Sequence, residues 1–135
     1  MAIATYPARA WVAPAFIKVA VLYFALGVLL GNYMGAKLDF SLSSVHAHIN
    51  LLGWVSLALA GVVYTLYPVA GKSRLALFHF WLANLALPIM MVTLALFMTG
   101  TRSVGPLLGI GSAVMGLAVL LFAVNVFRNV RPKAG

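Results

Sequence analysis

The stretch Ser44-Val-His-Ala-His-Ile-Asn-Leu-Leu-Gly-Trp54 opens an apolar segment that continues to Tyr67. An α-helix needs about 20 mostly apolar residues to cross the hydrocarbon core of a bilayer, and this segment is long enough. Backbone polar groups must find partners within lipid, and the segment lacks the alternation of a strand, so it predicts a transmembrane helix. Three further stretches have the same character, and the four predicted helices cover residues 11–34, 44–67, 75–98 and 104–127.

The composition supports this prediction for the whole chain. Of the 135 residues, 64% are hydrophobic and 7% are charged, whereas about a quarter of the residues in a soluble domain are charged. No linker or low-complexity run separates the apolar stretches, and the loops between them are short. We therefore expect an all-α protein with one four-transmembrane-helix membrane domain over residues 1–135, in which neighbouring helices are antiparallel.

The charge pattern predicts the orientation in the bilayer. The net charge is +8, and the only acidic residue is Asp39. The basic residues lie at helix ends and not in one cluster, which indicates contact with lipid and no nucleic-acid partner. Seven of the nine would lie on one side of the membrane: Arg9, Lys18, Lys72, Arg74, Arg128, Arg131 and Lys133. The other two are Lys37 and Arg102. By the positive-inside rule, both termini are predicted to be cytoplasmic.

His46 and His48 are the strongest functional candidates. Ionisable side chains at membrane depth are costly, so they often mark functional sites. Residues i and i+2 of an α-helix point about 200° apart, so these two imidazoles should serve different partners. Imidazole binds haem iron, copper and zinc, but zinc needs three or four ligands gathered in one place. A flat haem between helices fits opposed ligands better, with Asn50 and Trp54 beside it, although two interfacial histidines bound to backbone or water remain the alternative.

His79 and Asp39 are weaker candidates. His79 begins the third predicted helix, near the cytoplasmic face. Its depth in the membrane differs too much from that of the histidine pair for it to share a metal with them in the same subunit. It is either a packing residue or a second site that contacts a haem propionate, a quinone or a proton path. Asp39 precedes the second helix, where it favours the helix N-terminus or orients a ligand imidazole.

Tyrosines and glycines have structural interpretations. Tyr64 and Tyr67 are typical of the aromatic belt at a membrane surface. The motifs Gly27-x-x-x-Gly31-x-x-x-Gly35 and Gly105-x-x-x-Gly109 predict close helix packing. The absence of cysteine excludes thiolate-ligated clusters and c-type haem attachment. One acid cannot form a carboxylate pair, and no catalytic residues are identified, so the sequence does not favour an enzyme.

The segment His46-Ala-His48-Ile-Asn-Leu-Leu-Gly-Trp54 resembles the His-x-His helix of haem–copper oxidase subunit I, including its nitric oxide reductase relatives. The whole chain is similar to small bacterial four-helix proteins described as cytochrome c oxidase subunit I-like. The other matching pieces are Phe16-Ile-Lys18, Gly31-Asn-Tyr-Met34, Gly61-Val-Val-Tyr64, Pro68 and His79-Phe-Trp81. The resemblance implies that His46 and His48 ligate haem b from opposite faces of the helix. It further implies electron transfer, or O2 or NO binding, in the bacterial inner (cytoplasmic) membrane, with a redox partner or quinol.

The chain has the length of one of the three four-helix arcs of that family. It has no second histidine cluster for copper and too few acids for the family's proton channels, which argues against an oxidase or reductase reaction. If the chain is an enzyme, the resemblance implies an oxidoreductase of the oxidase or nitric oxide reductase type. Three copies would rebuild a twelve-helix ring, which predicts a cyclic homotrimer with a haem at each interface. The alternatives are a copper-binding or assembly partner of a larger oxidase, and a structural subunit without cofactor.

Overall fold

The computed structural model describes residues 8–132, and every regular element in this range is helical. The long helices are α1 (Val12–Lys37), α5 (Arg74–Met98) and α6 (Gly105–Asn129). A further continuous helical segment comprises α2 (Ser43–His48), the π-helix η1 (Ile49–Ser56) and α3 (Leu57–Leu66). The short helix α4 (Pro68–Gly71) and the 3-10 turn η2 (Arg102–Val104) lie in the connections.

The four predicted helices are confirmed, and all four are long and apolar enough to cross a membrane. Their ends agree with the predicted ends to within three residues. The largest difference is at the end of α1, which runs on to Lys37. There Leu38 takes a left-handed conformation, and the backbone N–H groups of Leu38 and Asp39 bond to carbonyls of the last turn.

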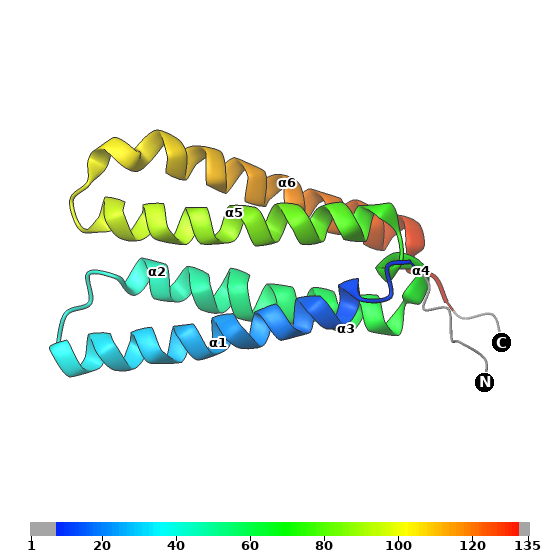
Figure 1. Cartoon of the computed structure of the whole chain (residues 1–135), viewed down its shortest axis with the longest axis horizontal. Helices are drawn as coiled ribbons and strands as arrows, with labels where there is room; N and C mark the ends of the chain where they lie inside the picture. Colours follow the sequence, from blue (N-terminus) through cyan, green and yellow to red (C-terminus); the bar gives the residue numbers. More distant parts are fainter. Residues whose placement is uncertain (1–7, 133–135) are drawn as a thin grey trace.

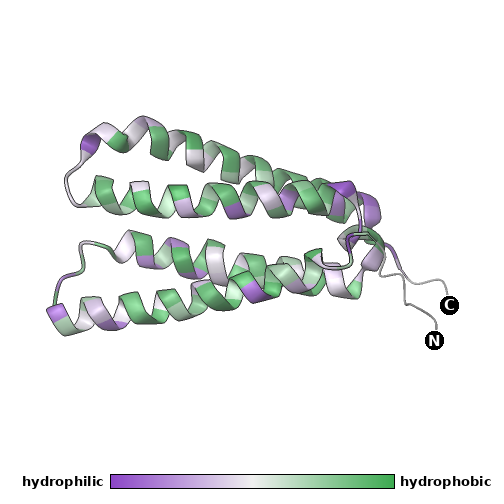
Figure 2. Cartoon of the chain, viewed as in Figure 1, coloured by the Kyte–Doolittle hydropathy of each residue, from purple (hydrophilic) through white to green (hydrophobic). Residues whose placement is uncertain are grey.

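The chain folds as two antiparallel helical hairpins (Figure 1). One hairpin pairs α1 with the α2–η1–α3 segment, and the other pairs α5 with α6. The hairpins lie together near the start of α1 and the end of α6, and they diverge toward the two loops at the opposite end (Figure 1). We call these the terminal end and the loop end. Hydrophobic residues run along all four long helical segments (Figure 2), and many large apolar side chains face outward, as expected in lipid.

Glycines set the close contact within the first hairpin. A Cβ atom built on Gly27 or Gly31 of α1 would meet the side chains of Asn50 and His46, at 2.6 and 3.0 Å. One built on Gly53 would meet the Tyr23 ring at 2.5 Å. The packing predicted for Gly27 and Gly31 is therefore confirmed. Gly35 and Gly109, in contrast, meet nothing within 4 Å in the described part of the chain.

An aromatic cluster joins the hairpins at the terminal end. Its members are Phe16 of α1, Tyr64 of α3, His79 of α5 and Phe122 of α6, with ring centroids 4.7–5.9 Å apart. The Tyr64 hydroxyl lies 3.0 Å from Nδ1 of His79. The prediction that Tyr64 belongs to the aromatic belt is wrong, because its side chain is only 1% exposed. Its hydroxyl finds a polar partner inside the core, so it does not need the membrane surface.

A polar network lies beside this cluster. Asn125 of α6 is fully buried, and its Nδ2 donates to the Ala70 carbonyl at 3.1 Å. Its Oδ1 accepts from Ser73 Oγ at 3.0 Å and from Asn129 Nδ2 at 2.7 Å. Ser73 also caps α5, accepting from the backbone N–H of Ala76. Asn125 therefore fixes the end of α6 to the turn between α4 and α5.

Candidate functional site

His48 presents one ring nitrogen that is free to act as a ligand. Its Nδ1 lies 2.7 Å from the carbonyl oxygen of Ser44, one turn earlier. A carbonyl can only accept, so Nδ1 carries the proton and the neutral ring has its lone pair on Nε2. That Nε2 makes no hydrogen bond to any residue in the range 8–132, and the side chain is half-buried. Ligand histidines are commonly fixed in this way through the opposite nitrogen.

His46 has a different environment. Its ring faces α1, where Cε1 would lie 3.0 Å from a Cβ on Gly31. The amide of Asn50 lies over the same ring, with Nδ2 at 3.4 Å from Nδ1, while its shorter bond, 2.8 Å, goes to the His46 carbonyl. His46 is thus held between α1 and its own helix. His48 follows two residues later on α2 and points about 200° away.

The other two residues predicted to line the site lie on the α1 side. Asn50 packs on Gly27, and Trp54 stacks on Phe24 with ring centroids 4.8 Å apart and an interplanar angle of 30°. The structure therefore brings His46, Asn50 and Trp54 together along α1 and separates His48 from them.

A π-helix follows the histidines directly. It covers Ile49–Ser56, and Ser56 Oγ donates to the Leu51 carbonyl, five residues earlier, at 2.7 Å. π-Helical turns are rare and are frequently found at functional sites. No pattern in the sequence predicts this π-helix, because the apolar residues of a lipid-facing helix are compatible with either winding.

The other polar residues of the loop end do not join the pair. Asp39 is exposed and accepts a hydrogen bond from the Ser41 backbone N–H at 3.0 Å, which holds the pKa of its carboxyl below the usual range. The predicted alternative role of Asp39, to orient an imidazole, is performed for His48 by the Ser44 carbonyl. Within residues 8–132, no three His, Asp or Glu side chains are grouped as a metal site would require.

An apolar crevice of about 380 Å³ lies between α1, η1 and α5, next to the pair. Neither histidine lines it. Its lining residues are Val19, Leu22, Tyr23, Leu26, Ile49, Pro88, Met91 and Val92.

His79, the predicted second site, lies in the aromatic cluster at the terminal end. Its side chain is 4% exposed, lies between the rings of Phe16 and Phe122, and bonds to Tyr64. This environment is that of a packed core histidine. Its position near the start of α5 is at the other end of the molecule from His48, as the sequence predicted.

These observations define what one chain can supply to a haem. One imidazole nitrogen, Nε2 of His48, is available as it stands. His46 becomes a ligand only if its ring turns away from Gly31 and Asn50. A haem with two axial histidines therefore fits the chain if the second imidazole comes from another copy.

Comparison of the chain with protein-family models, with curated proteins and with solved structures finds no match in any of the three.

Proposed function

We propose that this protein is a haem-binding membrane protein, similar to haem–copper oxidase subunit I, that transfers electrons or binds O2 or NO in a respiratory context. The single observation that carries the proposal is the free Nε2 of His48, opposite the bond from Nδ1 to Ser44. An interfacial histidine can make the same backbone bond, so the proposal depends on Nε2, which that bond leaves free with its lone pair. A ligand imidazole gains from this bond, because the ring is oriented before the ligand arrives.

The proposal includes a homo-oligomer, with a cyclic trimer favoured. His48 lies on the side of its helix that faces away from α1, so its Nε2 is available to a group shared with a neighbouring copy. His46 of the neighbouring copy supplies the other axial ligand across that interface, once its ring has turned away from Gly31 and Asn50. Each copy then presents its ligand on one side and receives a partner on the other, as a closed ring requires.

The location is the bacterial inner membrane, with both termini in the cytoplasm. In the described range, six basic residues lie at the terminal end of the bundle: Arg9, Lys18, Lys72, Arg74, Arg128 and Arg131. The loop end carries Lys37 and Arg102. The seventh predicted cytoplasmic base, Lys133, lies outside the described residues. By the positive-inside rule, this asymmetry supports an orientation with the histidine pair toward the external face.

A haem with two imidazole ligands supplies one-electron transfer, and one with a vacant axial position binds O2 or NO. The chain's own part is to fix the orientation of the His48 ring through Ser44. The apolar residues that follow His48 in η1 would help to exclude water from a metal bound there.

The test is a reduced-minus-oxidised absorption spectrum of the purified protein, with a metal assay on the same sample. We expect a b-type signal that is lost in His48→Ala. The matched control is His79→Phe, which changes a histidine of the aromatic cluster and should leave the signal in place. His46→Ala then decides whether His46 is the second ligand.

Each other outcome selects an alternative. Absence of a Soret band in the wild-type protein overturns the haem proposal. Bound copper in its place, lost with His48→Ala, supports the copper-binding or assembly role. A protein with neither cofactor favours the role of a structural subunit. A full haem content in a monomer measured in detergent overturns the trimer.

A further inference from the structure

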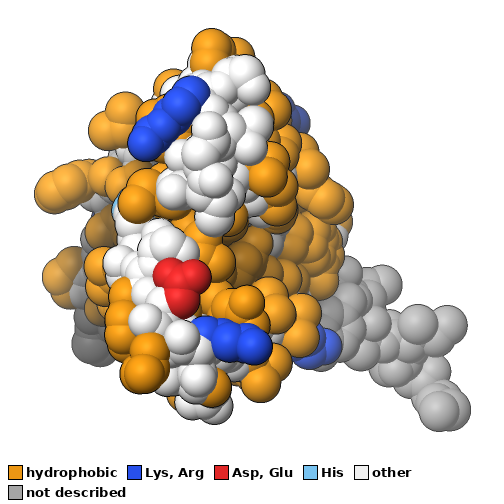
Figure 3. Space-filling model, turned by 90° about the vertical axis from the view of Figure 1, so that its left-hand side faces the viewer, with side chains coloured by type: hydrophobic (Ala, Val, Ile, Leu, Met, Phe, Trp, Pro, Cys, Tyr) orange, Lys and Arg blue, Asp and Glu red, His pale blue; other side chains and the backbone are white. Residues whose placement is uncertain are grey.

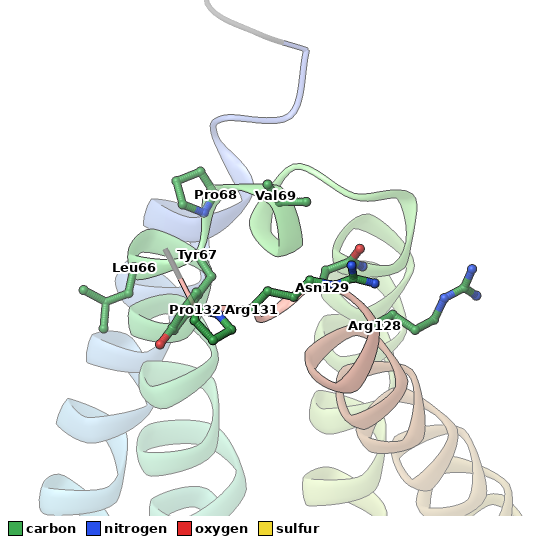
Figure 4. A pocket seen from close by; sticks show the side chains of 8 residues that line it. All are labelled: Leu66, Tyr67, Pro68, Val69, Arg128, Asn129, Arg131 and Pro132. Carbon is green, nitrogen blue, oxygen red and sulfur yellow. The ribbon is translucent and has the colours of Figure 1, made fainter. Parts of the chain in front are cut away.

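A hollow of about 420 Å³ opens at the terminal end, between the start of α4 and the end of α6. Its lining comes from two parts of the chain: Leu66, Tyr67, Pro68 and Val69 on one side, and Arg128, Asn129, Arg131 and Pro132 on the other. Figure 4 shows Pro68 and Val69 above the hollow, Tyr67 and Pro132 close together, and Asn129 and Arg128 on the α6 side. In this view the Arg128 side chain extends away from the hollow, so the hollow combines the Arg131 side chain with apolar walls.

The two arginines have no carboxylate partner among residues 8–132. The single acid of the chain, Asp39, lies in the loop after α1, at the opposite end of the molecule. Figure 3, which looks onto that loop end, shows the acidic side chain beside a basic one. Within residues 8–132, Arg128 and Arg131 are therefore cationic groups that no carboxylate neutralises.

The fixed geometry of the hollow indicates more than loose surface charge. The Asn129 amide donates to buried Asn125, which in turn bonds to the Ala70 carbonyl, so the end of α6 is tied to α4. This network holds the end of α6, which carries Arg128 and is followed by Arg131, against α4. A smaller hollow of about 200 Å³ lies on the other side of Pro68 and is lined by Arg9 and Lys72, so basic side chains flank α4 on both sides.

We propose that this hollow binds the headgroup phosphate of an anionic phospholipid, such as phosphatidylglycerol. Arginine matches a phosphate with two parallel hydrogen bonds, and such charge-assisted bonds are strong. The neighbouring apolar side chains Leu66 and Val69 are 58% and 71% exposed. They lie where a helix leaves the hydrocarbon, so they offer contact to the acyl chains of the same lipid. A free phosphate would use the arginines only, whereas a phospholipid uses both features.

The experiment is a native mass-spectrometry titration of the detergent-solubilised full chain with phosphatidylglycerol and, in parallel, with zwitterionic phosphatidylcholine. The test variant is Arg128→Gln with Arg131→Gln. The matched control is Lys37→Gln with Arg102→Gln, which removes the same charge from the loop end. Circular dichroism checks that both variants keep their helix content.

We expect the wild-type chain to bind phosphatidylglycerol more tightly than phosphatidylcholine. Loss of both arginines should weaken this binding about 10- to 100-fold, from the usual strength of hydrogen bonds to charged groups. The loop-end control should bind as the wild type does. Equal losses in the two variants would reduce the effect to net charge and overturn the site, as would equal binding of the two lipids.

Competition with inorganic phosphate distinguishes a phospholipid headgroup from free phosphate as the ligand of this hollow. Added at the lipid concentration that half-saturates the chain, inorganic phosphate should displace little phosphatidylglycerol, because it cannot use Leu66 and Val69. Efficient displacement would identify a site for free phosphate and overturn the lipid assignment. A variant that fails to fold is replaced by Arg128→Lys with Arg131→Lys, which keeps the charge and should still bind severalfold more weakly.

Discussion

The Tyr64 hydroxyl and Nδ1 of His79 lie 3.0 Å apart, and this hydrogen bond joins the two hairpins inside the hydrocarbon-spanning part of the fold. Both side chains are almost completely buried, at 1% and 4% exposure. The rings of Phe16 and Phe122 pack against both of them. The bond therefore lies at the point where all four long helical segments meet.

Replacing Tyr64 with phenylalanine should destabilise the protein by about 1–3 kcal/mol, because Nδ1 of His79 then stays buried without a partner. The change in the free energy of unfolding is measured by titrating the protein with a mixture of detergents. Tyr67→Phe is the control, since Tyr67 is half-buried and its hydroxyl makes no hydrogen bond to the described residues.

A double-mutant cycle with His79→Leu isolates the bond. The two single losses should sum to more than the loss in the double variant, since removing both partners leaves neither group unpaired. Additive losses would mean that the two residues contribute through packing only.

Gly61→Ala should force α1 and α3 apart. The new Cβ would lie 2.6 Å from Ile17 Cγ1 and 3.1 Å from both the Ala13 carbonyl oxygen and the Ile17 nitrogen, and backbone cannot move aside as a side chain can. We expect a loss of about 1–3 kcal/mol, the usual cost of overpacking, measured by thermal unfolding in detergent.

Gly116→Ala is the matched control for this substitution. A Cβ there meets no heavy atom within 4 Å. Alanine is the better helix former, so the variant should be more stable by about 0.5–1 kcal/mol. Equal losses at the two glycines would argue against the close α1–α3 contact.

Asp39 should titrate below the ordinary carboxyl value of 3.8, because the Ser41 backbone N–H bonds to its charged form. A lowered folded-state pKa gives stability that is present above the unfolded value and is lost as the pH falls through the folded one. An NMR pH titration of the carboxyl carbon measures the shift. Ser41→Pro removes the N–H and should return the pKa toward 3.8, whereas Ser41→Ala keeps the backbone donor and most of the shift.

The orientation can be tested cleanly because the chain contains no cysteine. A membrane-impermeant maleimide should label Ser41→Cys and Thr101→Cys in intact bacterial cells. Lys72→Cys, at the terminal end, should be labelled only after lysis. The reverse pattern would place the histidine pair at the cytoplasmic face and contradict the positive-inside assignment.

Hydropathy sufficed to predict the four spans, because crossing a bilayer demands length and apolar character, and both are visible in sequence. The small elements escaped prediction. Pro68 directly follows the second predicted helix, and in the structure it begins α4, because proline favours the first turn of a helix.

The candidate site was predicted in part. The opposed directions of His46 and His48 follow from helical spacing, but which one faces α1 depends on the register with Gly31, and register is a tertiary property. Tyr64 was misassigned for the same reason: its partner, His79, is 15 residues away and on another helix. Ser44 could not be singled out, because it acts through its backbone carbonyl.

The winding of the π-helix at Ile49–Ser56 sets the rotation of α2 about the helix axis relative to α3. Residues before it and residues after it belong to two α-helical stretches whose angular relation depends on how tightly these eight residues wind. Rewinding them as α-helix would turn the histidines around the helix axis relative to Tyr64, with no change in the sequence. The direction in which His48 points thus depends on the winding of a backbone stretch that contains neither histidine. Inserting or deleting one residue in that stretch would turn His48 by about 100° around the helix axis relative to α3.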